Sequence, residues 1–135
     1  MRIEVVHPDH FQLAWPLVSG FIAAALEHSH GEYNVDQAKV YLSTGQWALY
    51  VAVDDAGTLH GAGAVQFNSR PNDRTAFIMA IGGKLLTNKD TWQQFTELLR
   101  QRGATRVEGA VRESIAKLAK RYGFTEKYRI VGVSL

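Results

Sequence analysis

The chain has 135 residues, 46% of them hydrophobic, which is enough for one domain with its own core and too few for two ordinary domains. It contains no cysteine, so disulfide bonds, thiolate metal ligands and a cysteine nucleophile are excluded. No apolar run approaches the roughly 20 residues that span a bilayer, and the first residues lack the layout of a secretory signal, so a soluble, cytoplasmic protein is expected.

The charge is nearly balanced overall but uneven along the chain. There are 15 Lys and Arg against 13 Asp and Glu, which argues against a dedicated nucleic-acid-binding protein. Residues 1–99 hold six basic and ten acidic side chains, whereas residues 100–135 hold nine basic and three acidic ones. The basic end would attract a polyphosphate ligand, RNA or an acidic protein surface, and a solvated basic face is the plain alternative.

The beginning of the chain predicts a strand and then a helix. Polarity alternates from Ile3 to His7, and Pro8 should end this strand. Apolar residues are dense from Phe11 to about His28, which predicts a helix. Pro16 and Gly20 lie inside it and weaken a continuous helix, so a kink or break near Pro16 is expected.

A second helix and a hairpin follow. Asn34 is a suitable cap for a helix over Val35 to Leu42, and Gly45 should end it. Two runs rich in apolar residues, Trp47 to Val53 and Leu59 to Phe67, flank an Asp-Asp-Ala-Gly turn. This pattern predicts an antiparallel hairpin.

Glycines mark the next strands. Gly61 and Gly63 lie inside a strand with no helix after them, which favours a bulge or a close approach of another backbone. The continuous apolar run from Arg74 to Ile81 is typical of a strand in the centre of a sheet. Gly82 and Gly83 should end this strand.

The next helix should begin after Thr87 or Asn88 and end at Gly103. Its apolar residues recur at helical spacing: Trp92, Phe95, Leu98 and Leu99.

The last third predicts a strand, a short helix and a final strand. Thr105 to Val111 should form the first strand, Ser114 to Tyr122 the helix, and Tyr128 to Leu135 the last strand. Gly123 follows a helical turn that carries Lys120 and Arg121, which is the usual pattern of a helix C-terminus.

These elements predict one domain over residues 1–135, of the α/β or α+β layered class, with a mixed, mostly antiparallel sheet flanked by helices. The element order, the Gly61-Ala62 pair and the Gly123-Phe124 ending resemble the GNAT superfamily of N-acyltransferases over essentially the whole chain. The short GNAT-like proteins of bacteriophages are especially similar. The resemblance implies splayed central strands that hold acetyl-CoA or another acyl-CoA, and transfer of its acyl group to an amine.

The resemblance also implies where the co-substrate would bind. Main-chain groups of the strand would hold pantetheine, and the next helix start would meet the phosphates. The loop departs from the family's Gln/Arg-x-x-Gly-x-Gly/Ala pattern, and the alternative is that the two glycines merely make the turn. The implied cofactor-binding residues are Met79, Ala80, Ile81, Gly82, Gly83, Lys84, Asn88, Lys89 and Arg121.

The family's catalytic tyrosine lies in the last helix, five positions before the Phe of Gly-Phe. Counting back from Phe124 gives Ala119, so the tyrosine is missing here. Tyr122 or Tyr128 is the substitute that could protonate the departing thiolate, and a place in the core or at its rim is the alternative for either.

Acyl transfer to an amine also needs a base, usually a carboxylate or a water held by one. Glu108, in the middle of its strand, is the candidate, and the alternative is an outward-facing residue paired with Arg106 or Arg112. His28 and His30 do not have the spacing of metal ligands, so no metal is expected.

Two functions therefore remain open. The first is an N-acyltransferase that acts on a small-molecule or protein amine, and the second is a catalytically degenerate GNAT-like binding or structural module. A phage-encoded module would be found in the host cytoplasm or in the virion. Neither membrane nor nucleic acid is expected as a partner, and a homodimer is one option for the oligomeric state.

Overall fold

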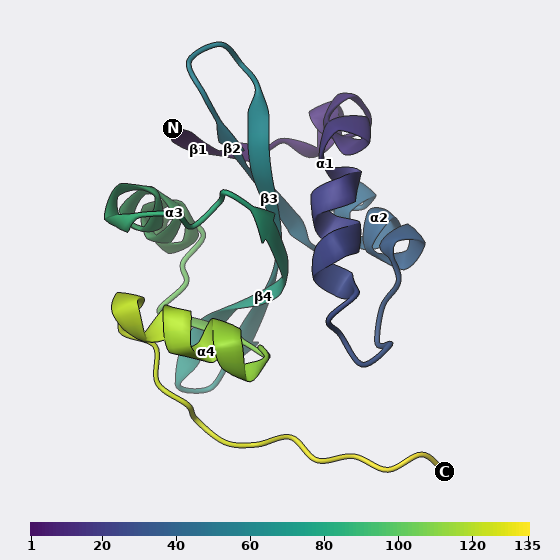
Figure 1. Ribbon diagram of the computed structural model, residues 1–135, viewed down its shortest axis with the longest axis vertical. Coiled ribbons are helices and arrows are strands. Elements are labelled where there is room, and N and C mark those ends of the chain that lie inside the picture. The colour runs from purple at the N-terminus through teal and green to yellow at the C-terminus, as the bar shows by residue number, and fades with distance from the viewer.

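The computed structural model describes residues 1–135, and Figure 1 shows the arrangement of its helices and strands. The helices are α1 (Phe11–Leu26), α2 (Val35–Ser43), α3 (Lys89–Gln101) and α4 (Glu113–Ala119), with short 3-10 turns at η1 (Pro8–His10) and η2 (Lys120–Tyr122). The strands are β1 (Arg2–Val6), β2 (Ala48–Val53), β3 (Leu59–Arg70), β4 (Asp73–Gly83) and β5 (Arg106–Gly109). Each helix and strand lies within a few residues of the range predicted from the sequence, but the strand predicted from Tyr128 to Leu135 is absent.

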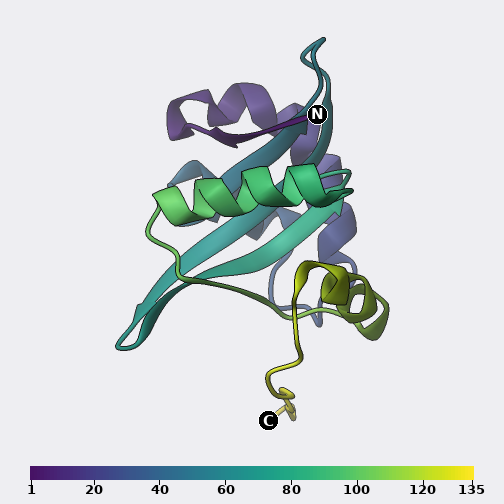
Figure 2. The ribbon, with the colours of Figure 1, turned by 90° about the vertical axis from the view of Figure 1, so that its left-hand side faces the viewer.

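The five strands form one sheet in chain order, from β1 to β5. Neighbouring strands are antiparallel except β4 and β5, which are parallel because the chain crosses over between them through α3. Helices α1 and α2 pack on one face of the sheet and α3 packs on the other (Figure 2). This is the layered domain with a mixed, mostly antiparallel sheet that the sequence predicts.

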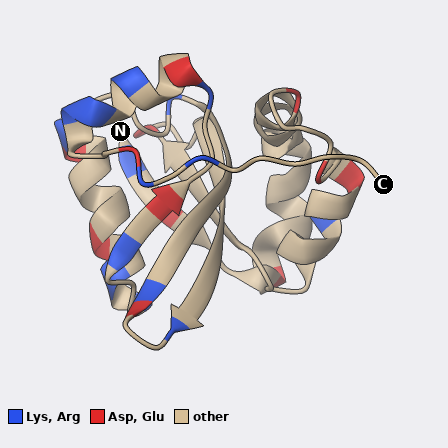
Figure 3. Ribbon diagram, turned by 90° about the horizontal axis from the view of Figure 1, so that it is seen from below, with Lys and Arg blue, Asp and Glu red and all other residues tan.

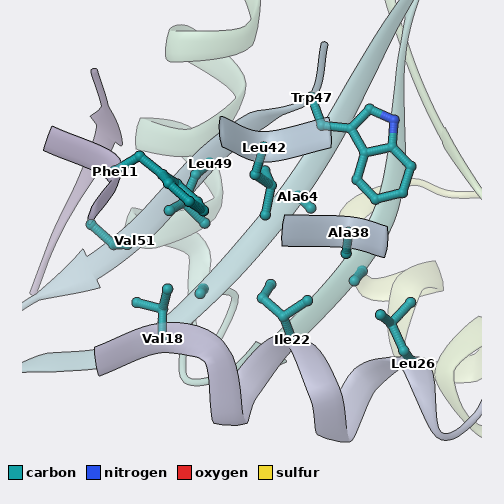
Figure 4. Close-up of a cluster of buried hydrophobic side chains, with 12 residues drawn as sticks. Phe11, Val18, Ile22, Leu26, Ala38, Leu42, Trp47, Leu49, Val51 and Ala64 are labelled. Carbon is teal, nitrogen blue, oxygen red and sulfur yellow. The ribbon is translucent and has the colours of Figure 1, made fainter. Parts of the chain in front are cut away.

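The α1 face of the sheet carries the first of two hydrophobic clusters (Figure 4). Val18 and Ile22 of α1 pack with Leu42 of α2 over Leu49 of β2, and all four are buried. Helix α1 continues through Pro16, so the break predicted there does not occur. Proline removes one backbone donor, but buried side chains before and after it hold the helix on the sheet.

The α3 face carries the second cluster, in which Phe95 and Leu85 are fully buried. A Cβ added to Gly63 would lie 2.8 Å from Cδ2 of Leu85, and one added to Gly61 would lie 2.7 Å from the amide nitrogens of Lys84 and Leu85. The two glycines of β3 therefore make room for the loop that leads into α3. This confirms the close backbone approach predicted from their position.

Local signals set the helix ends as predicted. Asn34 caps α2 in a reciprocal box with Gln37, and Asn88 caps α3 in another with Thr91. Gly123 ends η2 in the left-handed region with a φ of 88°, which glycine adopts without a steric penalty.

The predicted strand from Tyr128 to Leu135 is wrong for this structure. Residues 125–135, here called the C-terminal tail, form no helix or strand and are exposed throughout. The tail leaves the domain as an extended segment (Figures 1 and 2). Its β-branched residues favour extended backbone, but a strand needs a neighbour to pair with, and no segment lies beside this one.

Candidate functional site

β4 separates from β5 about halfway along its length. The two strands pair from Thr75 with Arg106 to Ile78 with Gly109, where β5 ends, and β4 continues to Gly83. Residues 79–83 therefore present main-chain N–H and C=O groups on a side where no strand pairs with them. The sheet is open at this point.

A β-bulge lies where the strands separate. Pairing of β3 with β4 passes from Val65 and Ile78 to Ala64 and Ala80, so Met79 has no partner of its own. Ile78 packs on the α3 face, whereas Met79 and Ala80 both pack on the α1 face. Because a bulge bends its strand and increases the local twist, it accounts for the divergence of β4 from β5 here.

Leu85 and Trp92, two large side chains that follow β4 in the sequence, are engaged elsewhere. Leu85 lies against Gly63 of β3. The ring of Trp92 lies 5.3 Å from the rings of both Tyr122 and Phe124 and 6.3 Å from that of Phe95. Neither side chain therefore packs mainly against the opening between β4 and β5.

Gly82 and Gly83 are packed tightly. A Cβ on Gly82 would lie 2.5 Å from the carbonyl oxygen of Phe21 in α1, and one on Gly83 would collide with the carbonyl oxygen of His60 in β3. That same oxygen accepts a hydrogen bond from the amide of Lys84 at 2.8 Å. The glycines thus let the end of β4 pass between α1 and β3. This geometry supports the alternative that they serve the turn.

The candidate cations gather near the start of α3. Lys84 and Lys89 are exposed at either end of the loop before the helix. Exposed Arg121 lies next to Tyr122, whose ring packs on Trp92 near the beginning of α3. None of these cations has a carboxylate within 4 Å, and basic residues are concentrated on the α3 and α4 side of the domain (Figure 3).

Glu108 lies on the opposite side of the sheet. Its neighbour Val107 packs on the α3 face, so Glu108 points to the other face. Its side chain is 16% exposed and lies 3.4 Å from guanidinium nitrogens of both Arg70 and Arg106. The predicted pairing with Arg106 is therefore present, and Asp73 joins the same cluster through Arg70 and Arg106.

The three candidate catalytic residues do not meet. Tyr122 is half-buried against Trp92 on the α3 side, whereas Glu108 faces the other side of the sheet. Tyr128 is 71% exposed in the C-terminal tail. Ala119, at the end of α4, occupies the position that the family's tyrosine would take, and it lines a cavity of about 170 Å³.

Comparison with known proteins rests on structure alone. No protein-family model matches the chain, and no curated protein matches it in sequence. A ribosomal-protein-alanine N-acetyltransferase from Brucella melitensis biovar Abortus 2308 matches with a TM-score of 0.69 at 13% identity, over all of both chains. A probable acetyltransferase matches with a TM-score of 0.68 at 17% identity, over 100% of this chain and 97% of the other. An aminoglycoside acetyltransferase from an uncultured soil metagenomic sample, solved with sisomicin, matches with a TM-score of 0.68 at 10% identity, over 99% of this chain and 94% of the other.

The chain has the GNAT fold. Within this fold the open part of the sheet is the splayed gap that the resemblance implies, and the bulge at Met79 accounts for it. Sequence reasoning missed the bulge because Ile78, Met79 and Ala80 are all apolar, so an extra residue leaves no mark on the pattern.

A cavity beside β5 was also missed from the sequence. It has a volume of about 410 Å³ and lies between α3, the start of β5 and the segment Tyr122 to Phe124. None of residues 79–89 lines it, whereas the candidate acid Tyr122 does. Its residues come from two stretches of the chain, 92–107 and 122–124, which no local motif connects.

Neither a metal-binding group nor a membrane-spanning helix is found in the structure. No three His, Asp or Glu side chains come together as a metal-binding group. None of the helices combines the length and the apolar character that crossing a bilayer requires.

Proposed function

We propose that the chain is a small N-acetyltransferase that moves an acetyl group from acetyl-CoA to a small-molecule amine. The observation that carries the proposal is the open main-chain edge of β4 beyond the bulge at Met79. The fold neighbours add support, because those compared above are acetyltransferases and match over nearly the whole of both chains.

The open edge fits a pantetheine arm. Pantetheine carries two amide groups, and an unpaired strand edge can bind an extended amide chain in the way that it binds another strand. Met79, Ala80 and Ile81 would provide these main-chain hydrogen bonds. When bound, acetyl-CoA supplies the acetyl thioester that an amine can attack.

Binding of the acetyl-CoA phosphates would depend on side chains more than on a glycine loop. Gly82 and Gly83 are packed between α1 and β3, and the amide of Lys84 already has a backbone partner. The helix start at Asn88 and Lys89 offers first-turn amides and the positive end of the α3 dipole. Lys84, Lys89 and Arg121 would add the neutralising charge, which makes salt-sensitive binding the expectation.

The proposal also names the class of acceptor amine and the groups that donate and remove protons. The fold neighbours include an aminoglycoside acetyltransferase and a ribosomal-protein-alanine N-acetyltransferase, so a small-molecule and a protein amine both have a precedent, and the small-molecule amine is the acceptor tested first. Tyr122 is the better candidate for the acid because it belongs to the domain, whereas Tyr128 lies in the exposed tail. Glu108 is held by two arginines, so we assign proton removal to water.

The second candidate function is a GNAT-like module without acyl transfer. Ala119 in place of the family's tyrosine and the ion pairs of Glu108 favour it. A phage-encoded module of this kind would act by binding a partner in the host cytoplasm or in the virion.

The test is an NMR and calorimetric titration of the full chain with acetyl-CoA. Amide signals of residues 79–83 should shift, and Lys89→Glu and Arg121→Glu should weaken binding by about fivefold or more each, since losing one close charge contact costs about 1 kcal/mol and reversing the charge adds repulsion. Lys39, which is exposed on α2, provides the matched control: Lys39→Glu should bind acetyl-CoA like the wild type. A substitution at Gly83, such as Gly83→Asp, would not test the phosphate site, because Gly83 has a φ of 66° and no space for a side chain.

The two functions predict different results. Binding followed by acetylation of a polyamine or aminoglycoside, detected as released thiol, supports the enzyme. Binding without turnover over a broad amine panel supports the module. An absence of shifts at residues 79–83 would refute the proposed site.

A further inference from the structure

The two faces of the sheet differ in charge balance at the end where β3 turns into β4. On the α1 face, Arg70 and Arg106 share two carboxylates, those of Asp73 and Glu108. These four side chains form a balanced network of ion pairs. On the α3 face, two further arginines lie at the same end of the sheet, and neither has a carboxylate within 4 Å. Positive charge on this face is therefore left without a partner.

The two arginines, Arg74 of β4 and Arg102 at the end of α3, lie against one aromatic ring. The Cζ atom of Arg102 is 4.8 Å from the ring centroid of Phe67, and the Cζ atom of Arg74 is 5.2 Å from it. Phe67 itself packs on the α3-face cluster. The ring attracts both cations, but two guanidinium groups beside one ring also repel each other. An anion between them would remove this repulsion.

Arg74 is held in a fixed position by four hydrogen bonds. Its Nε donates to the carbonyl oxygen of Arg102 at 2.9 Å, and its Nη1 donates to Oγ of Ser69 at 2.9 Å. Its backbone amide donates to Oγ1 of Thr105, and its carbonyl oxygen accepts from the amide of Thr105. The bond to a C-terminal carbonyl of α3 explains why Arg74 lies here, since cations stabilise helix C-termini. It leaves the guanidinium of Arg102 unexplained.

We propose that Arg74 and Arg102 bind a phosphate dianion, either inorganic phosphate or the phosphate group of a small monoester. The side chain of Arg102 donates no hydrogen bond within the protein, and Nη2 of Arg74 also remains free. Guanidinium groups match phosphate oxygens in pairs, and a tetrahedral anion has enough oxygens for both arginines. The bound dianion would provide on this face the negative charge that two carboxylates provide on the other.

This phosphate site is distinct from the site proposed for acetyl-CoA. Lys89 begins α3 and Arg102 caps its other end, so the helix of 13 residues separates the two sites by about 20 Å. Arg100 and Thr105, on either side of Arg102 in the sequence, line the cavity of about 410 Å³ beside β5. That cavity gives the organic part of a monoester space next to the phosphate. The phosphate site does not depend on the proposed acetyltransfer.

An NMR titration of the full chain with inorganic phosphate and with phenyl phosphate, at constant ionic strength and without acetyl-CoA, tests the site. The side-chain Nε–H signals of Arg74 and Arg102 should shift and reach saturation. Arg102→Gln should weaken binding about fivefold or more, and Arg74→Lys should also weaken it, because lysine keeps the charge but loses the paired donors. Exposed Arg2, in the strand at the opposite edge of the sheet, is the matched control, and Arg2→Gln should bind like the wild type.

The comparison of the two probes identifies the form of the ligand. Tighter binding of phenyl phosphate would assign the site to a monoester, and equal binding would assign it to inorganic phosphate; both results support the site. Arg102→Gln is the deciding variant, because Arg102 is exposed and its side chain holds no other group, so the variant should fold. Shifts that chloride reproduces, equal weakening by Arg2→Gln, or full binding by Arg102→Gln would overturn the proposal. The two arginines would then only join the β3–β4 hairpin to α3.

Discussion

Gly63 and Leu85 should be energetically coupled, because Leu85 occupies the space that a side chain at position 63 would need. A Cβ at Gly63 would lie 2.8 Å from Cδ2 of Leu85, which is closer than real carbon contacts allow. Gly63→Ala should therefore destabilise the fold by about 1 to 3 kcal/mol through overpacking. Leu85→Ala removes a fully buried side chain and should cost about 3 kcal/mol. The double variant should be about as stable as Leu85→Ala alone, which gives a coupling energy equal to the cost of Gly63→Ala, about 1 to 3 kcal/mol.

Gly61 provides the matched comparison for this double-mutant cycle of Gly63 and Leu85. Its added Cβ would lie 2.7 Å from backbone nitrogens of Lys84 and Leu85, and shortening a side chain cannot relieve that contact. Gly61→Ala should therefore stay as harmful with Leu85→Ala as without it. Exposed Gly20 in α1 has nothing within 4 Å, so Gly20→Ala should stabilise the fold by roughly 0.5 to 1 kcal/mol.

Urea unfolding followed by the fluorescence of the three tryptophans measures all of these variants. If Gly63→Ala and Leu85→Ala lower the free energy of unfolding additively, Leu85 does not fill the space over Gly63 and the reasoning fails. The same conclusion would follow if Leu85→Ala relieved Gly61→Ala as well as it relieved Gly63→Ala.

Three further predictions concern single residues. Asn88→Ala should lower the free energy of unfolding by about 1 kcal/mol in the same urea assay, because it removes the cap of α3. Tyr50→Phe should leave that free energy unchanged or raise it by up to about 1 kcal/mol, since the buried hydroxyl has no hydrogen-bond partner; a clear loss would contradict this. The hydrogen bond from His60 at 2.7 Å lowers the pKa of Asp54, so carbon-detected NMR should give a midpoint below 3.8 that rises in His60→Ala. A lowered pKa means that this carboxylate stabilises the fold above its unfolded pKa and that the contribution is lost as the pH falls through the folded one.

Much of the fold is predictable because local chemistry marks the ends of its elements. Asn34 and Asn88 have side chains that satisfy helix N-termini, and Gly123 adopts a conformation that ends a helix. Gly61 and Gly63 mark a close approach because no other residue would leave the space. Each of these signals is contained in a few neighbouring residues.

The features that sequence reasoning misses depend on distant partners. Strand propensity is present in the tail, but whether residues 128–135 form a strand is decided by what lies beside them. Alternation along β5 predicts the pairing of Glu108 with Arg106, yet the second partner, Arg70, comes from the hairpin between β3 and β4. The continuous helix α1 likewise reflects packing against the sheet, which outweighs the local effect of Pro16.

Met79 is not needed to place the other residues of β4. Without it, Ile78 would face α3, Ala80 would face α1 and Ile81 would face α3, in unbroken alternation and on the faces they occupy now. The hydrophobic core would therefore tolerate a strand shorter by one residue, and that strand could run straight beside β5. Deletion of Met79 would remove one side chain that packs against the α1-face cluster but would leave its neighbours on the same faces, so the opening depends on a residue that the alternation of β4 does not require.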